Sequence, residues 1–176
     1  MISPADAAKA AGILFVAVIV QVSILDDVSI LNGRPKLLLV TVVCVALLRG
    51  AIFGAVAGFI AGFIADTGTF TTLGFTSLLL TLAGYWTGRY GETTGRDRAH
   101  APLLSVAVVT ALYQFGALVL HFMLGEPAPA RVVLLDGLVP TVVLNVLLTF
   151  PVYALLRRLL PPVEWGDRIR EVRLLG

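Results

Sequence analysis

The sequence predicts an all-α integral membrane protein with six transmembrane helices in a compact bundle. Of its 176 residues, 58% are hydrophobic and 14% are charged, with a mean hydropathy of +0.95. Soluble domains average about 45–50% apolar and about 25% charged residues, and one domain of this length cannot bury so much apolar surface. The net charge of +2 gives no indication of a nucleic-acid partner. A single cysteine, Cys44, excludes an internal disulfide and a cysteine metal cluster.

The apolar segments predict the first three spans, because a helix needs about 20 residues to cross a bilayer. The first runs from Ala7 to Leu25 and precedes a polar loop, 26–36. The next segment, Leu37 to Ala65, is apolar for 29 residues apart from Arg49. As one helix it would place Arg49 near the bilayer centre, at a cost of about 2.5–3.5 kcal/mol. We therefore predict two short helices with a tight turn at Arg49–Gly50, which lets Arg49 snorkel to the interface.

The rest of the chain alternates polar segments with three further spans. After a polar turn at 66–72, the predicted spans are Leu73–Tyr90, Ala101–Leu124 and Val132–Leu156, separated by loops at 91–100 and 125–131. The aromatic residues that end the first of these are typical of a membrane interface. Residues 1–160 are thus predicted to form a single transmembrane domain, and 161–176 a short cytoplasmic tail.

The basic residues predict the orientation of the bundle. Six helices put both termini on one side, together with Lys9, Arg49, Arg89, Arg96, Arg98, Arg157, Arg158, Arg168, Arg170 and Arg173. Only Arg34, Lys36 and Arg131 fall on the other side. Since cytoplasmic loops carry an excess of Lys and Arg, both termini are predicted to be cytoplasmic. A five-helix count gives a similar split, so the cost of burying Arg49 is what favours six.

The clearest local pattern is a ladder of small residues at Gly50, Gly54, Gly58 and Gly62. Residues four apart lie on one helix face, and a face without side chains lets two helix backbones approach closely in a membrane. The ladder is therefore interpreted as a packing face within this bundle or as a docking face for a partner's transmembrane helix. The spacing alone leaves both interpretations open.

Several polar residues fall within or beside the spans. Asp66 follows the ladder by one turn, and we interpret it as a solvated turn residue or as a functional carboxylate at membrane depth. Asp136 lies near the outer end of the last span, with Arg131 five residues away. Gln21, Gln114 and Asn145 lie inside spans, where each is expected to make an interhelical hydrogen bond or to line a pocket.

The sequence gives no indication of catalysis or of a cofactor. It lacks the HExxH, GxSxG and GxGD motifs, and no Lys-Ser or Lys-Thr follows the glycines as in a phosphate-binding loop. We therefore do not expect an enzyme.

The order of these features resembles the MreD family, the small membrane subunit of the bacterial rod-shape system. The first span ends near Gln21, and Pro35 leads into LLLV. The glycine ladder runs into Gly58–Phe59 and Asp66. The later features that carry the resemblance are Leu73–Gly74, Gly84–Tyr85, Gly88, Asn145 and Pro151.

The resemblance implies a non-catalytic scaffold of the cell-wall elongation machinery in the bacterial inner membrane. It implies a bitopic partner similar to MreC, and a link between cytoplasmic MreB filaments and the RodA glycosyltransferase with its transpeptidase. It extends the helix-packing or docking set to Phe59, Gly74, Gly84 and Gly88.

The resemblance also implies an alternative. The family's fold is similar to the substrate-binding subunits of energy-coupling-factor vitamin transporters. In that alternative the chain binds a small molecule in an external pocket near Arg34, Asp66, Arg131 and Asp136.

Overall fold

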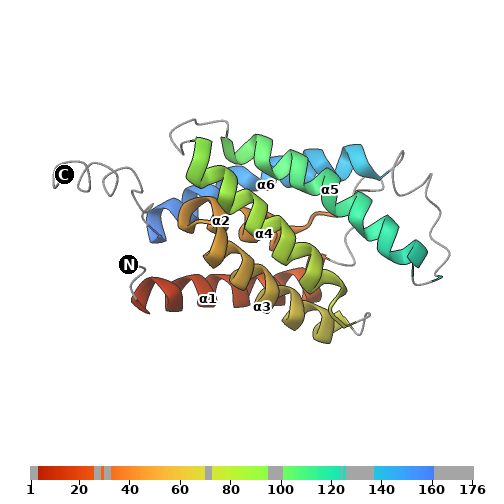
Figure 1. Ribbon diagram of the computed structural model, residues 1–176, viewed down its shortest axis with the longest axis horizontal. Helices are drawn as coiled ribbons and strands as arrows, with labels where there is room; N and C mark the ends of the chain where they lie inside the picture. The colour runs from red at the N-terminus through yellow and green to blue at the C-terminus, as the bar shows by residue number, and fades with distance from the viewer. Residues whose placement is uncertain are drawn as a thin grey trace, which may run out of the picture.

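A computed structural model describes residues 4–25, 29, 33–69, 73–94, 101–123, 125 and 137–160. Over these residues the chain forms six α-helices and one π-helical turn (Figure 1). The elements are α1 (Pro4–Val20), η1 (Gln21–Leu25), α2 (Leu37–Arg49), α3 (Ala51–Thr69), α4 (Phe75–Thr94), α5 (Ala101–Met123) and α6 (Leu138–Leu159). The predicted all-helical fold is confirmed.

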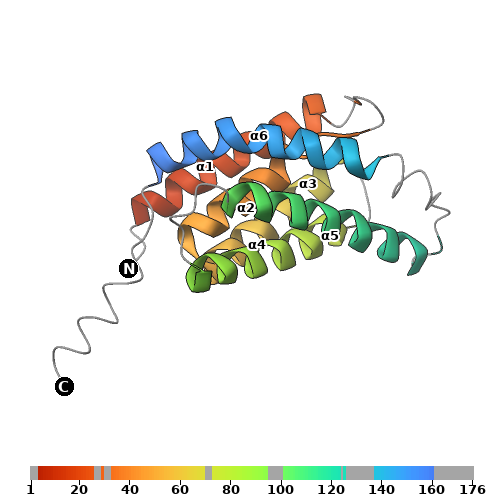
Figure 2. The ribbon, with the colours of Figure 1, turned by 90° about the horizontal axis from the view of Figure 1, so that it is seen from above.

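Helix α2 lies at the centre of the bundle and contacts each of the other five helices. Every residue of α2 from Leu38 to Arg49 is buried. Figure 2 shows α2 between α1 and α6 on one side and α4 and α5 on the other. At about 1.5 Å per residue, the 13 residues of α2 reach about 20 Å, less than a hydrocarbon core of about 30 Å. A helix this short cannot cross a bilayer alone, and all five other helices contact it.

The break between α2 and α3 falls at Gly50, as predicted. Gly50 adopts φ 95° and ψ 179°, a conformation that disfavours residues with a side chain. Its N–H donates to the carbonyl of Ala46 at 2.8 Å, which closes the last turn of α2. The two helices therefore reverse direction in a single residue.

The helices alternate in direction, so each end of the bundle collects particular residues. We call one end the Asp6 end, where α1, α3 and α5 begin and α2, α4 and α6 finish. We call the opposite end the Gln21 end, after the residue at which α1 passes into η1. In Figure 1 the Asp6 end lies on the left, next to the N-terminus.

The predicted element boundaries are shifted at several points. Helix α3 continues through Asp66 to Thr69, where a polar turn was predicted, and α4 continues to Thr94 into the predicted loop. Helix α6 continues past Arg157 and Arg158 to Leu159. A helix does not stop where its sequence becomes polar, because side chains beyond the apolar layer are solvated or paired. The predicted tail, 161–176, lies outside the described residues.

Four of the described helical segments are long and apolar enough to cross a membrane: Asp6–Leu25, Ala51–Thr69, Ala101–Val119 and Leu138–Leu159. Their outward surfaces carry many large exposed apolar side chains, such as Ile52 at 80% and Leu112 at 63% exposure. Soluble monomers rarely expose contiguous apolar surface of this extent. The fold is therefore that of a membrane protein with helix faces suited to lipid.

Candidate functional site

The glycine ladder of α3 faces α4 inside the protein. A Cβ atom added at Gly54 or Gly62 would lie 2.5 Å from Ala46 Cβ or Ser77 Cα, respectively. A Cβ added at Gly58 would overlap the carbonyl oxygen of Leu80. Real Cβ atoms do not approach other atoms so closely, so these positions have no space for a side chain, and Gly54 is enclosed by α2 as well as by α4. The ladder thus packs within this chain and is not a free outward surface.

Helix α4 contributes glycines of its own to the same interface. A Cβ at Gly84 would overlap the carbonyl group of Gly54, and a Cβ at Gly88 would overlap Gly50 and Ala51. Glycines from both helices therefore alternate along one contact, and α3 and α4 run side by side in antiparallel directions (Figure 1). Such close contact maximises dispersion between the two backbones, which is the main attraction available to helices in lipid.

A carboxylate at the end of α3 caps the start of α4. Asp66 is 0% exposed, and its two carboxylate oxygens accept hydrogen bonds from the N–H groups of Gly74, Thr76 and Ser77 at 3.0–3.2 Å. The first N–H groups of a helix lack partners within that helix and favour a negative charge. Asp66 is therefore buried and hydrogen-bonded and is not a solvated turn residue, which corrects that prediction.

Gly74 has a different role from the other glycines that were predicted to pack between helices. It adopts φ +90°, and an added Cβ would meet no atom within 4 Å. This backbone conformation, which glycine adopts readily, forms a turn that presents the Gly74 N–H to Asp66.

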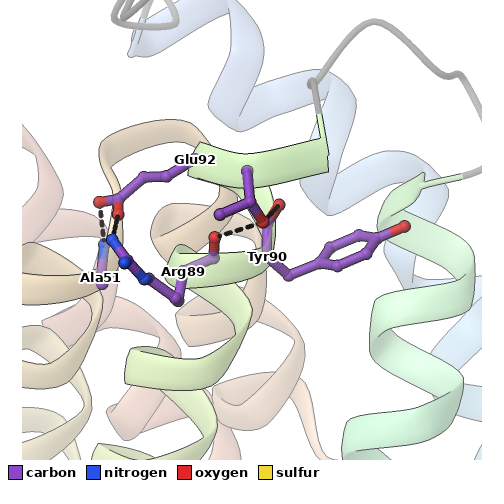
Figure 3. A network of polar contacts seen from close by, with 5 residues as sticks. Ala51, Arg89, Tyr90 and Glu92 are labelled. Carbon is purple, nitrogen blue, oxygen red and sulfur yellow. Dashed lines mark hydrogen bonds and ion pairs between the residues drawn. The ribbon is translucent and has the colours of Figure 1, made fainter.

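The opposite end of the helix pair repeats this arrangement with the helices exchanged. Glu92, near the end of α4, accepts a hydrogen bond from the N–H of Ala51 at the start of α3, at 2.8 Å (Figure 3). Its second carboxylate oxygen lies 3.4 Å from Arg89 Nη1. Figure 3 also shows Tyr90 pointing away from this pair. Helices α3 and α4 therefore cap each other at both ends of a glycine-lined contact.

Two residues predicted to make interhelical hydrogen bonds hold the chain that enters α2. Asn145, fully buried in α6, accepts a hydrogen bond from the N–H of Lys36 at 2.8 Å and donates one to Thr110 of α5 at 3.0 Å. Gln21 donates to the carbonyl of Pro35 and accepts from the N–H of Leu38, both at 3.4 Å. These amides satisfy backbone groups that would otherwise be unpaired inside the bundle.

The segment 33–36 itself lies against α6. The N–H of Arg34 donates to Thr141 Oγ1 at 3.2 Å, and a Cβ at Gly33 would lie 2.7 Å from Pro140 Cβ. The ammonium group of Lys36 lies 4.8 Å from the centre of the Tyr113 ring, a cation–π geometry. The backbone of this segment therefore packs against α6 at the start of α2, while the Arg34 side chain is exposed.

At the Asp6 end, Arg49 is buried and does not snorkel as predicted. Its Nη1 lies 3.1 Å from Asp6 Oδ2, and the side chains are 2% and 22% exposed. A carboxylate on α1 therefore balances the charge of Arg49 inside the protein.

The other predicted site residues are dispersed. Phe59 is 54% exposed on the outer side of α3, away from the ladder, and stacks on Phe63 with ring centres 6.3 Å apart. Arg34 is exposed and Gln114 half-buried, and no hydrogen bond holds the Gln114 amide within the described residues. Arg131 and Asp136 lie outside the described residues. The external pocket therefore stays a prediction.

Sequence reasoning missed Asp6, Glu92, Thr110 and Thr141. Each one bonds to a group far away in the chain, and the sequence carries no local signal of that contact. Within the described residues, no three His, Cys, Asp or Glu side chains group in a way that could hold a metal ion. The buried polar groups described above bind backbone or one another, which is chemistry of assembly.

The comparisons agree with the resemblance. The family model described as rod shape-determining protein MreD matches residues 10–160. No curated protein and no solved structure matches the chain. The similarity to transporter substrate-binding subunits therefore stays a prediction.

Proposed function

The chain belongs to the MreD family of rod shape-determining proteins, and we propose that it is a non-catalytic membrane scaffold of the cell-wall elongation machinery. The family gives it a role in determining rod shape. The finer proposal is that its outward helix faces dock a MreC-like bitopic protein. Through that partner it helps to link MreB filaments to RodA and a transpeptidase.

One observation supports this proposal above the others: the interior is occupied by contacts that hold the bundle itself. The glycine ladder packs against α4, Asp66 caps a helix, and Asn145 holds the start of α2. What the chain offers to a partner in the membrane is therefore its outer apolar surface. The stacked Phe59 and Phe63 are part of that surface on α3.

We further propose that all six helices cross the inner membrane with both termini in the cytoplasm. Helix α4 is less apolar than the others because its last turns carry the charged Arg89 and Glu92, whereas Leu78, Leu82 and Trp86 are exposed. Its lipid-facing side is thus apolar although its average is not. Helix α2 is short but enclosed on all sides.

Affinity purification of the tagged protein from its native membrane tests the proposal. In mild detergent we expect a bitopic coiled-coil protein and cell-wall polymerases to co-purify, identified by mass spectrometry. Recovery of a membrane coupling subunit with a pair of ATPases would overturn the scaffold function.

A matched pair of variants makes this experiment specific. Phe59→Ala/Phe63→Ala alters the exposed α3 face, and Leu147→Ala/Phe150→Ala makes a similar change on the exposed face of α6. If one face docks the partner, one double variant loses it while both remain folded and monodisperse. Full recovery by both variants would exclude these two faces and move the search to α1 and α5.

A further inference from the structure

Arg49 has an unused hydrogen-bonding edge inside the protein. Its Nη1 pairs with Asp6, whereas Nε and Nη2 are buried and have no hydrogen-bond partner in the described part of the chain. These two nitrogens share one side of the planar guanidinium and point the same way. That side is the fork that binds two oxygens of a carboxylate or a phosphate. Leaving buried charged donors unpaired is costly, so the fork is suited to an anionic ligand.

The position of Arg49 along the bundle is that of a membrane interface. Gly88 of α4 packs against Gly50 and Ala51, so Arg49 lies level with the last turns of α4. The partly exposed aromatic residues Tyr85, Trp86 and Tyr90 lie in those turns, and such residues gather at the level of lipid headgroups. Immediately beyond the turn, Ile52 is 80% exposed, as expected for a side chain that contacts acyl chains.

The charge at this end also favours an anion. The described residues of the Asp6 end include five basic side chains, Lys9, Arg49, Arg89, Arg157 and Arg158, against two acidic ones, Asp6 and Glu92. Glu92 is held by Ala51 and Arg89, and Asp6 lies against one nitrogen of Arg49. Basic groups at a membrane surface attract anionic lipids.

We propose that the Nε–Nη2 edge of Arg49 binds the phosphate of an anionic phospholipid headgroup in the adjacent leaflet. The Asp6 carboxylate, whose side chain is 22% exposed, pairs with Nη1 of the same guanidinium, whose side chain is 2% exposed. The Asp6 carboxylate repels the incoming phosphate and competes for the same cation. It therefore limits the affinity of the site. The inference does not depend on which leaflet is cytoplasmic, nor on the scaffold function.

Native mass spectrometry of the purified protein tests this inference. The probes are phosphatidylglycerol and, as a zwitterionic reference, phosphatidylcholine. We expect the wild-type protein to retain phosphatidylglycerol preferentially and Arg49→Lys, which keeps the charge but loses the fork, to retain about tenfold less. Asp6→Asn is expected to retain more than the wild type. Arg89→Lys, at an exposed arginine of the same level, should stay within about twofold.

Arg49→Lys and Asp6→Asn together distinguish a lipid site from a purely structural ion pair. If Arg49 and Asp6 form only a structural pair, both variants lower stability, and neither changes the preference between the two lipids; that result overturns the proposal. The gain expected for Asp6→Asn does not depend on whether Arg49→Lys folds. Millimolar inorganic phosphate separates the possible sources of the phosphate group. If inorganic phosphate displaces phosphatidylglycerol from the wild-type protein and takes its place, the fork binds a free anion. That result would overturn the lipid assignment.

Discussion

At the scale of single residues, α3 and α4 can approach closely because three ladder positions, Gly54, Gly58 and Gly62, have no side chain. The neighbours of Gly58 are backbone atoms of Leu80 and Thr81, which cannot rotate away as a side chain would. Additional volume here must separate the helices or distort one of them. The same physics makes the reciprocal Gly84 and Gly88 sensitive to substitution.

Gly58→Ala should therefore destabilise the protein by about 1–3 kcal/mol, and Gly58→Leu by more. The matched control is Gly12→Ala, since Gly12 lies in α1 with nothing within 4 Å of an added Cβ. Alanine is the better helix former, so Gly12→Ala should leave stability unchanged or slightly higher. Thermal unfolding in detergent measures both variants. Equal stability of Gly58→Ala and Gly12→Ala would show that the close contact at Gly58 is not needed.

Asp66 acts as a charged cap. Asp66→Asn keeps one acceptor oxygen but places an amide donor against N–H groups of α4, so we expect a loss of about 1–3 kcal/mol. Thr67→Ala is the control, because the Thr67 hydroxyl is exposed and bonds only within its own helix. Hydrogen exchange should be faster at the amides of Thr76 and Ser77 in Asp66→Asn alone. Unchanged exchange at these two amides would contradict the capping role.

At the scale of elements, α3 and α4 form one unit by packing on each other, whereas the start of α2 is held by side chains from other elements. The start of α2 makes its specific hydrogen bonds to side chains of η1 and α6. Asn145 is central to this support, because it bonds both the N–H of Lys36 and Thr110. A helix N-terminus enclosed by protein needs such partners, since lipid offers none.

Asn145→Leu keeps the approximate volume but leaves the N–H of Lys36 unpaired, and we expect a loss of about 2–4 kcal/mol, the sum of two buried hydrogen-bond sites. Gln114→Leu makes a comparable polar-to-apolar change in α5 at a half-buried position and should cost less than 1 kcal/mol (about the effect of a surface change). Denaturant unfolding of the two variants compares these costs. A smaller effect at Asn145 than at Gln114 would mean that the start of α2 is held by other contacts.

At the scale of the whole molecule, bilayer thickness made much of the fold predictable. It sets the length of an apolar span, and the cost of burying Arg49 correctly indicated the break at Gly50. The predicted snorkelling of Arg49 was wrong because its partner, Asp6, lies 43 residues away in the chain. The prediction of a solvated Asp66 was wrong for a related reason. The sequence does not reveal that the N–H groups at the start of α4 donate to this carboxylate. Spacing predicted that the ladder would pack closely, but its partner α4 emerged only in three dimensions.

The whole-molecule proposal of six crossings makes a prediction about sidedness. Ser29 is exposed and lies between η1 and α2, whereas Thr93 is exposed near the end of α4, at the Asp6 end. With both termini in the cytoplasm, a membrane-impermeant maleimide on intact spheroplasts should label Ser29→Cys but not Thr93→Cys, and lysis should expose both. The native Cys44 is buried and should not react. Labelling of Thr93→Cys alone would show that the protein has the opposite orientation in the membrane. Labelling of both variants before lysis would show that α2, α3 and α4 do not make the three crossings between these sites.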